Sequence, residues 1–310
     1  MNHTNRQESI LVLGAGELGF EVLRHLAQHA DKHPSVRIYA QLRPSTIEST
    51  DPAKKQHVDQ LRALGIETVA GDVATSGQEA LAALLAPYDT VISCIGFSAG
   101  RSTQVKITKA VLKAEVKRYV PWQFGVDYDT IGRGSAQDVF DEQLDVRDLL
   151  RAQSGTEWLI VATGMFTSFL FDPSFGVVDL EHDSVHALGS WENRVTVTTP
   201  EDIGLLTTVI LFHEPRFKHD TIFVAGDTLS YGEMADELER QLGRTLTREA
   251  WSTDHLSKAL AADPDNNLLK YHAVFAAGGG VAWPKETTFN YRQGIETVDV
   301  STWISRHLVK

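Results

Sequence analysis

The sequence has a single cysteine, Cys94, among 310 residues, so no disulfide bond can form within the chain. One free thiol is typical of a protein from a reducing compartment, and we expect a cytoplasmic location. The first nine residues are polar and lack the apolar core of a signal peptide. No apolar run approaches the roughly 18 residues that a membrane-spanning helix needs, so the sequence predicts no membrane contact.

Basic residues are also scarce, with 29 Lys and Arg against 41 Asp and Glu and a formal net charge of −12. The longest basic clusters are the pairs Lys54-Lys55 and Lys117-Arg118, which are too short for a phosphate-binding surface. We therefore predict no nucleic-acid partner. No grouping of His, Cys and carboxylates has the spacing of a metal site, so we expect no metal. A homodimer stays open as an alternative, although no exposed apolar stripe demands it.

The first half of the chain alternates short apolar runs with helical patterns. The expected strands cover residues 10–13, 36–42, 66–70, 90–95, 118–120 and 157–162. The last expected helix before the sixth strand covers residues 136–153, with Ser135 as its cap. This alternation predicts an α/β fold with a doubly wound parallel sheet, in which ligands lie beyond the carboxyl ends of the strands.

Three glycines stand at the first junction between a strand and a helix. Gly14, Gly16 and Gly19 form the pattern G-x-G-x-x-G. The first permits a tight turn, the second lets the backbone approach a pyrophosphate, and the third allows close packing of helix and strand. The amino-terminus of the helix then meets the phosphates with free N–H groups. This combination predicts a Rossmann-type dinucleotide site.

The end of the second strand selects the cofactor. A site for NAD has Asp or Glu there, to hold the ribose hydroxyls. This chain has Ala-Gln-Leu-Arg-Pro-Ser over residues 40–45 instead. The guanidinium of Arg43 suits a 2′-phosphate, so we predict NADP (NADPH) rather than NAD, the alternative being a solvated arginine.

The pattern changes after Gly164. Short strands are expected at residues 185–188, 195–198 and 221–224, and helices at 202–212, 232–242 and 268–277. We expect an NADP-binding domain over residues 1–163 and a smaller mixed α/β substrate domain over residues 164–310, with elements that can interleave.

Several segments resemble the isoflavone reductase-like and NmrA-like families of atypical short-chain dehydrogenases. The best match is V-K-R-Y-V-P-W-Q-F-G at residues 116–125, which is similar to the family pattern V-K-R-F-x-P-S-E-F-G. Others are V-I-S-C-I-G at 91–96, Q-V-K-I at 104–107, F-D-E-Q-L-D-V-R at 140–147 and T-P-E-D-I-G at 199–204. The resemblance covers the chain from about Ile10 to about Leu238.

The resemblance implies a Rossmann domain with a small carboxyl-terminal substrate domain, and it implies site residues by position. The phosphate end would be held by Gly14, Gly16, Glu17, Leu18, Gly19 and Arg43. The ribose and adenine side would be lined by Ser93, Cys94, Ile95, Gly96 and Gln104. Gln123 and Phe124 would lie beside the nicotinamide, and Met165 and Phe166 would join cofactor to substrate.

The catalytic group is where the sequence departs from the family. No tyrosine has the Tyr-x-x-x-Lys spacing of ordinary short-chain dehydrogenases, and the lysine of the family's F-x-x-K helix is replaced by Gln143. Phe140, Gln143, Leu144 and Arg147 share one helical face, so Gln143 can still hydrogen-bond to a ribose or substrate oxygen. An amide is neither acid nor base in this pH range. Tyr128 is the alternative polar group near a substrate, unless it only packs.

Aromatic side chains crowd the segment after Gly164, and two or three of them are expected to line a substrate pocket. The candidates are Met165, Phe166, Phe169, Trp191 and Tyr271. One hypothesis is an NADPH-dependent reductase that transfers hydride to a small aromatic or phenolic substrate, at a benzylic ether, an activated alkene or a carbonyl. The alternative is an NmrA-like NADP-binding redox sensor or regulator without turnover, for which loss of the lysine is typical.

Overall fold

The computed structural model describes residues 7–309, so most of the polar segment 1–9 lies outside the described residues. Contacts divide the chain into two compact units built from alternating segments. The first unit contains the chain up to Gln123 with residues 145–161 and 203–221. The second contains residues 124–144, 162–202 and 222–310. In the part of the chain that is described, no helix is both long and apolar enough to cross a bilayer.

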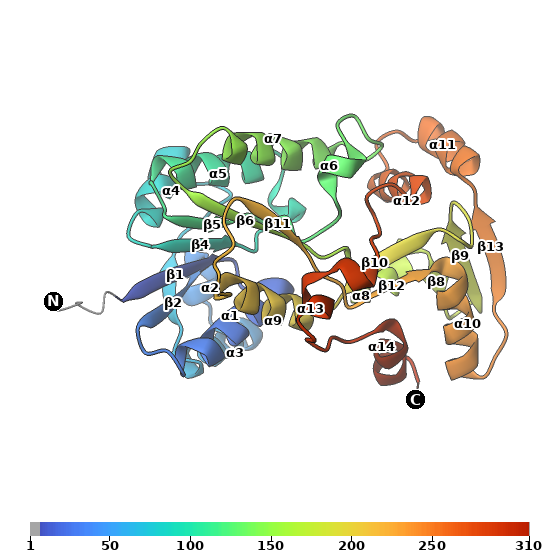
Figure 1. The fold of residues 1–310 in the computed structure, drawn as a ribbon, viewed down its shortest axis with the longest axis horizontal. Helices are drawn as coiled ribbons and strands as arrows, with labels where there is room; N and C mark the ends of the chain where they lie inside the picture. Colours follow the sequence, from blue (N-terminus) through green and yellow to red (C-terminus); the bar gives the residue numbers. More distant parts are fainter. Residues whose placement is uncertain (1–6, 310) are drawn as a thin grey trace. The chain divides into compact units, whose positions relative to one another are not determined.

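A seven-stranded sheet forms the centre of the first unit (Figure 1). Every pairing recorded among the six of its strands that come first in the chain is parallel. Its order is β11 (Asp220–Phe223), β6 (Glu157–Ala162), β5 (Arg118–Val120), β4 (Thr90–Ser93), β1 (Glu8–Leu13), β2 (Val36–Leu42) and β3 (Glu67–Ala70). The central strands form because their continuous apolar runs are buried on both faces. The predicted doubly wound fold is therefore confirmed.

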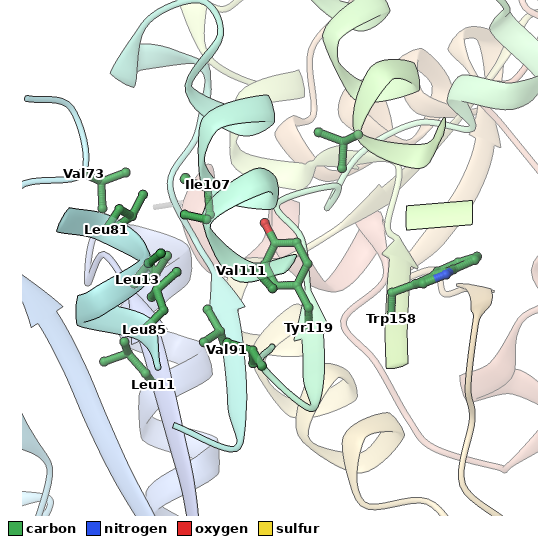
Figure 2. Close-up of a cluster of buried hydrophobic side chains, with 14 of the residues drawn as sticks. Leu11, Leu13, Val73, Leu81, Leu85, Val91, Ile107, Val111, Tyr119 and Trp158 are labelled. Carbon is green, nitrogen blue, oxygen red and sulfur yellow. The ribbon is translucent and has the colours of Figure 1, made fainter. Parts of the chain in front are cut away.

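Helices cover both faces of this sheet (Figure 1). One face carries α1 (Glu17–Ala30), α3 (Pro52–Ala63) and α9 (Pro200–Leu211), and the other carries α4 (Gln78–Leu85), α5 (Thr103–Lys113) and α7 (Val139–Arg151). Figure 2 shows the core on the second of these faces. Leu11 and Val91 on the strands pack in one buried cluster with Leu85 and Val111 on the helices. Burial of such a cluster supplies most of the unit's folding free energy.

The second unit has two small sheets. One has the order β12 (Asp227–Ser230), β10 (Arg194–Thr198) and β7 (Met165–Phe166), and the other β13 (Thr247–Trp251), β9 (Ser184–Leu188) and β8 (Val178–Asp179). Its helices are α6 (Tyr128–Ile131), α8 (Thr167–Leu170), α10 (Tyr231–Leu242), α11 (Thr253–Ala262), α12 (Asn267–Ala277), α13 (Phe289–Arg292) and α14 (Val300–His307). The unit is mixed α/β, as expected.

Two expectations about elements are wrong. The strand expected at residues 221–224 in the smaller half is β11, which extends the large sheet next to β6. The helix expected from residue 136 begins at Val139. The Ser135 hydroxyl donates to the carbonyl of Gln137 instead of capping the helix, because the chain there forms a turn. The short helix α2 (Pro44–Ile47) was also not expected.

Candidate active site

The glycine loop has the geometry that its spacing predicts. Gly14 has φ +82°, a left-handed conformation that favours glycine. A Cβ at Gly19 would lie 2.2 Å from the carbonyl oxygen of Gly14, so only glycine allows α1 to pack this closely. A Cβ at Gly16 would meet nothing within 4 Å. Gly16 is also the N-cap of α1 and provides no side-chain cap, which leaves the start of the helix open to an anion.

A cavity of about 300 Å³ opens beside this loop, at the carboxyl ends of four strands of the sheet. It is lined by Gly14, Ala15, Gly16, Gln41, Leu42, Arg43, Thr46, His57, Asp72, Val73, Ala74, Cys94, Ile95, Gly96, Ser98 and Ala99. All of these residues belong to the first unit. This is the edge where ligands of doubly wound sheets lie.

Arg43 and Asp72 are the charged pair of this cavity. Arg43 follows β2, is exposed, and is the N-cap residue of α2. Asp72 follows β3, and its Oδ1 accepts hydrogen bonds from the backbone N–H groups of Ala74 (2.9 Å) and Thr75 (3.4 Å). Partial desolvation opposes ionisation, but these bonds and the charge of Arg43 hold the pKa of Asp72 below its ordinary value. Asp72 therefore carries a negative charge at neutral pH.

The segment after β4 forms the far wall of the cavity. Cys94, Ile95 and Gly96 line it, and burial raises the pKa of the Cys94 thiol. Ser93 is fully buried, and within residues 7–309 its hydroxyl has no hydrogen-bond partner. Gln104 does not line the cavity, since its Nε2 donates to the carbonyl of Ile95 at 2.7 Å. Gln104 thus holds the backbone of Ile95 in place without lining the cavity itself.

The predicted nicotinamide-side residues are almost completely buried. The Gln123 Oε1 accepts a hydrogen bond of 2.7 Å from the Nε of Arg147, and Phe124 begins the second unit. On α7, Phe140, Gln143, Leu144 and Arg147 are all buried, which confirms the predicted shared face. Gln143, at the family's lysine position, has no exposed surface.

Tyr128 packs within the second unit. It lies at the start of α6 and is buried, and its ring stands edge-on to Phe140 with centroids 5.1 Å apart. A Cβ added to Gly125 would lie 2.7 Å from the Tyr128 hydroxyl oxygen, so glycine makes room for this hydroxyl.

An aromatic cluster continues from Phe140. Its ring centroid lies 5.8 Å from that of Tyr271, which lies 6.3 Å from that of Phe169. Burial raises the pKa of Tyr271 to about 12, so its phenol stays protonated, whereas Phe169 is 36% exposed. The structure thus brings together two of the predicted substrate residues, Tyr271 and Phe169.

The other predicted substrate residues lie on different elements. Met165 and Phe166 form β7, with Met165 buried and Phe166 half-buried. Trp191 lies in the loop between β9 and β10, where the guanidinium of Arg248 stands 5.9 Å from its ring centroid. Among residues 7–309, no group of three His, Cys, Asp or Glu side chains is placed to hold a metal ion.

The model of the NmrA-like family matches residues 6–290. The chain belongs to the NmrA-like family. The match reaches about fifty residues beyond Leu238, where the motif resemblance ended.

Two relatives match this chain over most of its length. An NmrA-like family domain-containing oxidoreductase of Gibberella moniliformis is 47% identical over 298 residues, covering 96% of this chain and 97% of the relative. The phenylcoumaran benzylic ether reductase Pyrc5 of Pyrus communis is 27% identical, covering 92% of each chain. These relatives confirm the resemblance to the isoflavone reductase-like group.

Two solved structures share the fold. A crystal structure of isoflavone reductase has a TM-score of 0.78 at 21% identity, covering 97% of this chain and 100% of that one. The binary complex of leucoanthocyanidin reductase with NADPH from Vitis vinifera has a TM-score of 0.72 at 22% identity, covering 97% and 96%. At these identities the likeness establishes the NmrA-like chain's fold alone.

Part of the cavity's wall was not predicted from the sequence. Thr46 on α2, His57 on α3 and Asp72 after β3 line it, and none of them belongs to a motif that was considered. The Gly71-Asp72 pair directly after the expected third strand was the available signal, because every carboxyl end of the sheet contributes to this edge.

Proposed function

We propose that the first unit of this chain binds NADPH in the cavity beside the glycine loop. The observation that carries the proposal is the combination of an uncapped start of α1, an open space at Gly16 and a guanidinium at Arg43 around one cavity. Phosphate oxygens fit free backbone N–H groups and a guanidinium. The binary complex of the Vitis vinifera neighbour with NADPH supports the same assignment.

Individual residues take separate parts of the cofactor in this proposal. Gly14, Gly16 and the N–H groups from Glu17 to Gly19 would hold the pyrophosphate, and Arg43 the 2′-phosphate. Leu18 and Gly19 are buried, so they would contribute backbone rather than side chains. Ser93 to Gly96 would line the adenosine side, with Gln104 supporting them through Ile95.

We further propose that the chain is a reductase for a small phenolic or aromatic compound, with the substrate held by the second unit. Bound NADPH supplies a hydride, and the protein supplies position. Gln143 would orient a ribose or substrate oxygen by hydrogen bonding, without exchanging a proton. The aromatic cluster of Tyr271 and Phe169 offers faces for stacking against a phenolic ring. The benzylic ether reductase from Pyrus communis supports this substrate class.

A cofactor sensor without turnover is the second candidate, and Gln143 is the observation that favours it. A buried amide at the family's lysine position can hold a cofactor but cannot supply a proton. Against this, the second unit keeps apolar and aromatic side chains that a sensor does not need. A cytoplasmic location stays a prediction under either function.

The deciding experiment measures NADPH oxidation at 340 nm with a panel of aromatic carbonyls, lignan-type benzylic ethers and enones. A reductase oxidises NADPH with at least one member, and NADPH titration gives saturable binding. Tight binding without turnover on any member would favour the sensor. Absence of binding would overturn both functions.

A further inference from the structure

A second cavity, of about 610 Å³, opens at the amino ends of the strands of the large sheet, opposite the glycine-loop cavity. It is lined by Gln7, Glu8, Asp89, Thr90, Lys117, Arg118, Ser154, Gly155, Glu157, Arg216, Lys218 and His219. These residues lie at or just before the amino ends of β1, β4, β5, β6 and β11, and all belong to the first unit. The proposed NADPH site, at the carboxyl ends, does not share a single residue with it.

Arg118 forms part of the wall of this cavity and is only 3% exposed. Its guanidinium donates to two backbone carbonyls, Nη1 to Leu211 and Nη2 to Phe217. A guanidinium has five N–H donors, so three of these stay available. Within the described chain no carboxylate lies within 4.0 Å of this group. Burial and the nearby charge of Arg216 lower the pKa of Arg118 to about 10, and the charges of Glu157, Glu8 and Glu214 oppose the shift. The group is still protonated at neutral pH.

Two of the three carboxylates that line the cavity form ion pairs with cations other than Arg118, and the third accepts a hydrogen bond from a hydroxyl. Asp89 pairs with Lys117 at 2.5 Å. Glu157 forms ion pairs with Lys218 at 2.5 Å and with Arg216 at 3.4 Å. Glu8 accepts the hydroxyl of Thr90 at 3.3 Å.

The charges that line the cavity therefore do not balance. Its four cations are Lys117, Arg118, Arg216 and Lys218, and its three carboxylates are Glu8, Asp89 and Glu157. This leaves one positive charge in excess, in a chain whose formal net charge is −12. A buried cation with no carboxylate in direct contact is costly, and an anion in the cavity would offset that cost.

We propose that this cavity is a binding site for a small oxyanion, a carboxylate or a phosphate monoester, with Arg118 as its innermost contact. The anion accepts hydrogen bonds from the free guanidinium N–H groups. The half-exposed side chains of Arg216 and Lys218, which also pair with Glu157, complete the coordination of the anion. The size of the cavity leaves room for a ring or chain attached to the acidic group.

Isothermal titration of the whole protein with phenyl phosphate, benzoate and neutral benzamide tests the proposal. We expect saturable binding of at least one anion and none of benzamide. The anion that binds identifies the acidic group as phosphate or carboxylate. Arg118→Met removes the innermost contact and should weaken binding at least tenfold.

A second variant covers the case in which Arg118→Met does not fold. Gly155 lines the cavity, and a Cβ there meets only the Gln153 Oε1, at 3.9 Å, so Gly155→Trp should fold and obstruct the cavity. Arg194→Gln, at an exposed arginine of the second unit, is the matched control and should bind as the wild type does. Arg43→Ala should also leave binding unchanged.

Three results would overturn the proposal. They are binding of benzamide as tight as that of the anions, anion binding by Gly155→Trp as tight as by the wild type, and loss of anion binding in Arg43→Ala. The last result would assign the anion to the glycine-loop cavity. None of these measurements needs NADPH or turnover, so their outcome is independent of the proposed reductase function.

Discussion

The Nε of Arg147 donates a hydrogen bond of 2.7 Å to the Oε1 of Gln123, and both side chains are buried. The bond joins α7 to the segment that follows β5. Removing this acceptor has a cost, because a hydrogen bond lost in the interior is not replaced by one to water.

Gln123→Leu should therefore destabilise the protein by about 1.5–3 kcal/mol, the typical contribution of a hydrogen bond to a charged group. Urea unfolding followed by circular dichroism gives the free energy of unfolding. Gln60→Leu, on the exposed side of α3, is the matched control and should change it by less than about 0.5 kcal/mol. Equal effects of the two substitutions would contradict a stabilising role for the buried bond.

Arg43→Ala should weaken NADPH binding by roughly 10- to 100-fold, as expected for a charge-assisted hydrogen bond worth about 1.5–3 kcal/mol. Binding of NADH, which has no 2′-phosphate, should stay the same. Fluorescence titration with both cofactors measures the two dissociation constants. Arg62→Ala, on an exposed arginine of α3 paired with Asp59, is the control. Equal NADPH and NADH affinities in the wild type would remove the basis for assigning NADP.

Gln143→Lys tests whether a side chain at this buried position can donate a proton during the reaction. Burial lowers the pKa of a lysine, so the new ammonium would release a proton near neutral pH. We expect a higher rate of NADPH oxidation with a responsive substrate, at some loss of thermal stability. Gln143→Met keeps a similar volume without a polar group and should be slower than the wild type. If all three proteins turn over at one rate, the position takes no part in the reaction.

His272 should make the second unit sensitive to acid. Its Nε2 lies 2.7 Å from the carbonyl oxygen of Phe175, and its buried Nδ1 has no partner within residues 7–309. Burial lowers the pKa of this imidazole, the bond to Phe175 partly opposes the shift, and His186 adds to it.

The sign follows from the unfolded chain, in which the imidazole takes up a proton near pH 6.5 while the folded protein does not. Stability is therefore present above pH 6.5 and is lost as the pH falls below it, by at most about 1.4 kcal/mol per pH unit. His272→Gln should flatten unfolding free energies measured between pH 7.5 and 5. His182→Gln, at an exposed imidazole paired with Asp179, should not. A slope unchanged by His272→Gln would assign the acid sensitivity to other groups.

Much of the first unit could be predicted because its signals are local. The strands β1 to β6 are short apolar runs, and the glycine spacing fixes the turn into α1. The membership of β11 in the large sheet was not predicted, because no local pattern specifies which sheet an apolar run joins. The strand β13 was missed for another reason. Four of its five residues are exposed, so it has no alternation of buried and exposed side chains.

The parts of the candidate site that are formed by the backbone could be predicted. The parts that are formed by side chains were harder to predict. Gly14 and Gly16 could be assigned from spacing alone. Gln104 and Gln123 were expected from a family pattern, but their partners, the carbonyl of Ile95 and the guanidinium of Arg147, depend on tertiary packing. His57 reaches the cavity from a helix whose sequence carries no binding motif.

The alternation of the chain between its two units limits how this protein can be taken apart. The boundaries fall after Gln123, Leu144, Val161, Asp202 and Thr221, so the chain passes between the units five times. No single cut releases either unit as a continuous fragment. Neither can be expressed from an uninterrupted stretch of coding sequence, nor exchanged with a relative by one recombination event. Any chimera that exchanges the second unit must therefore exchange several segments together.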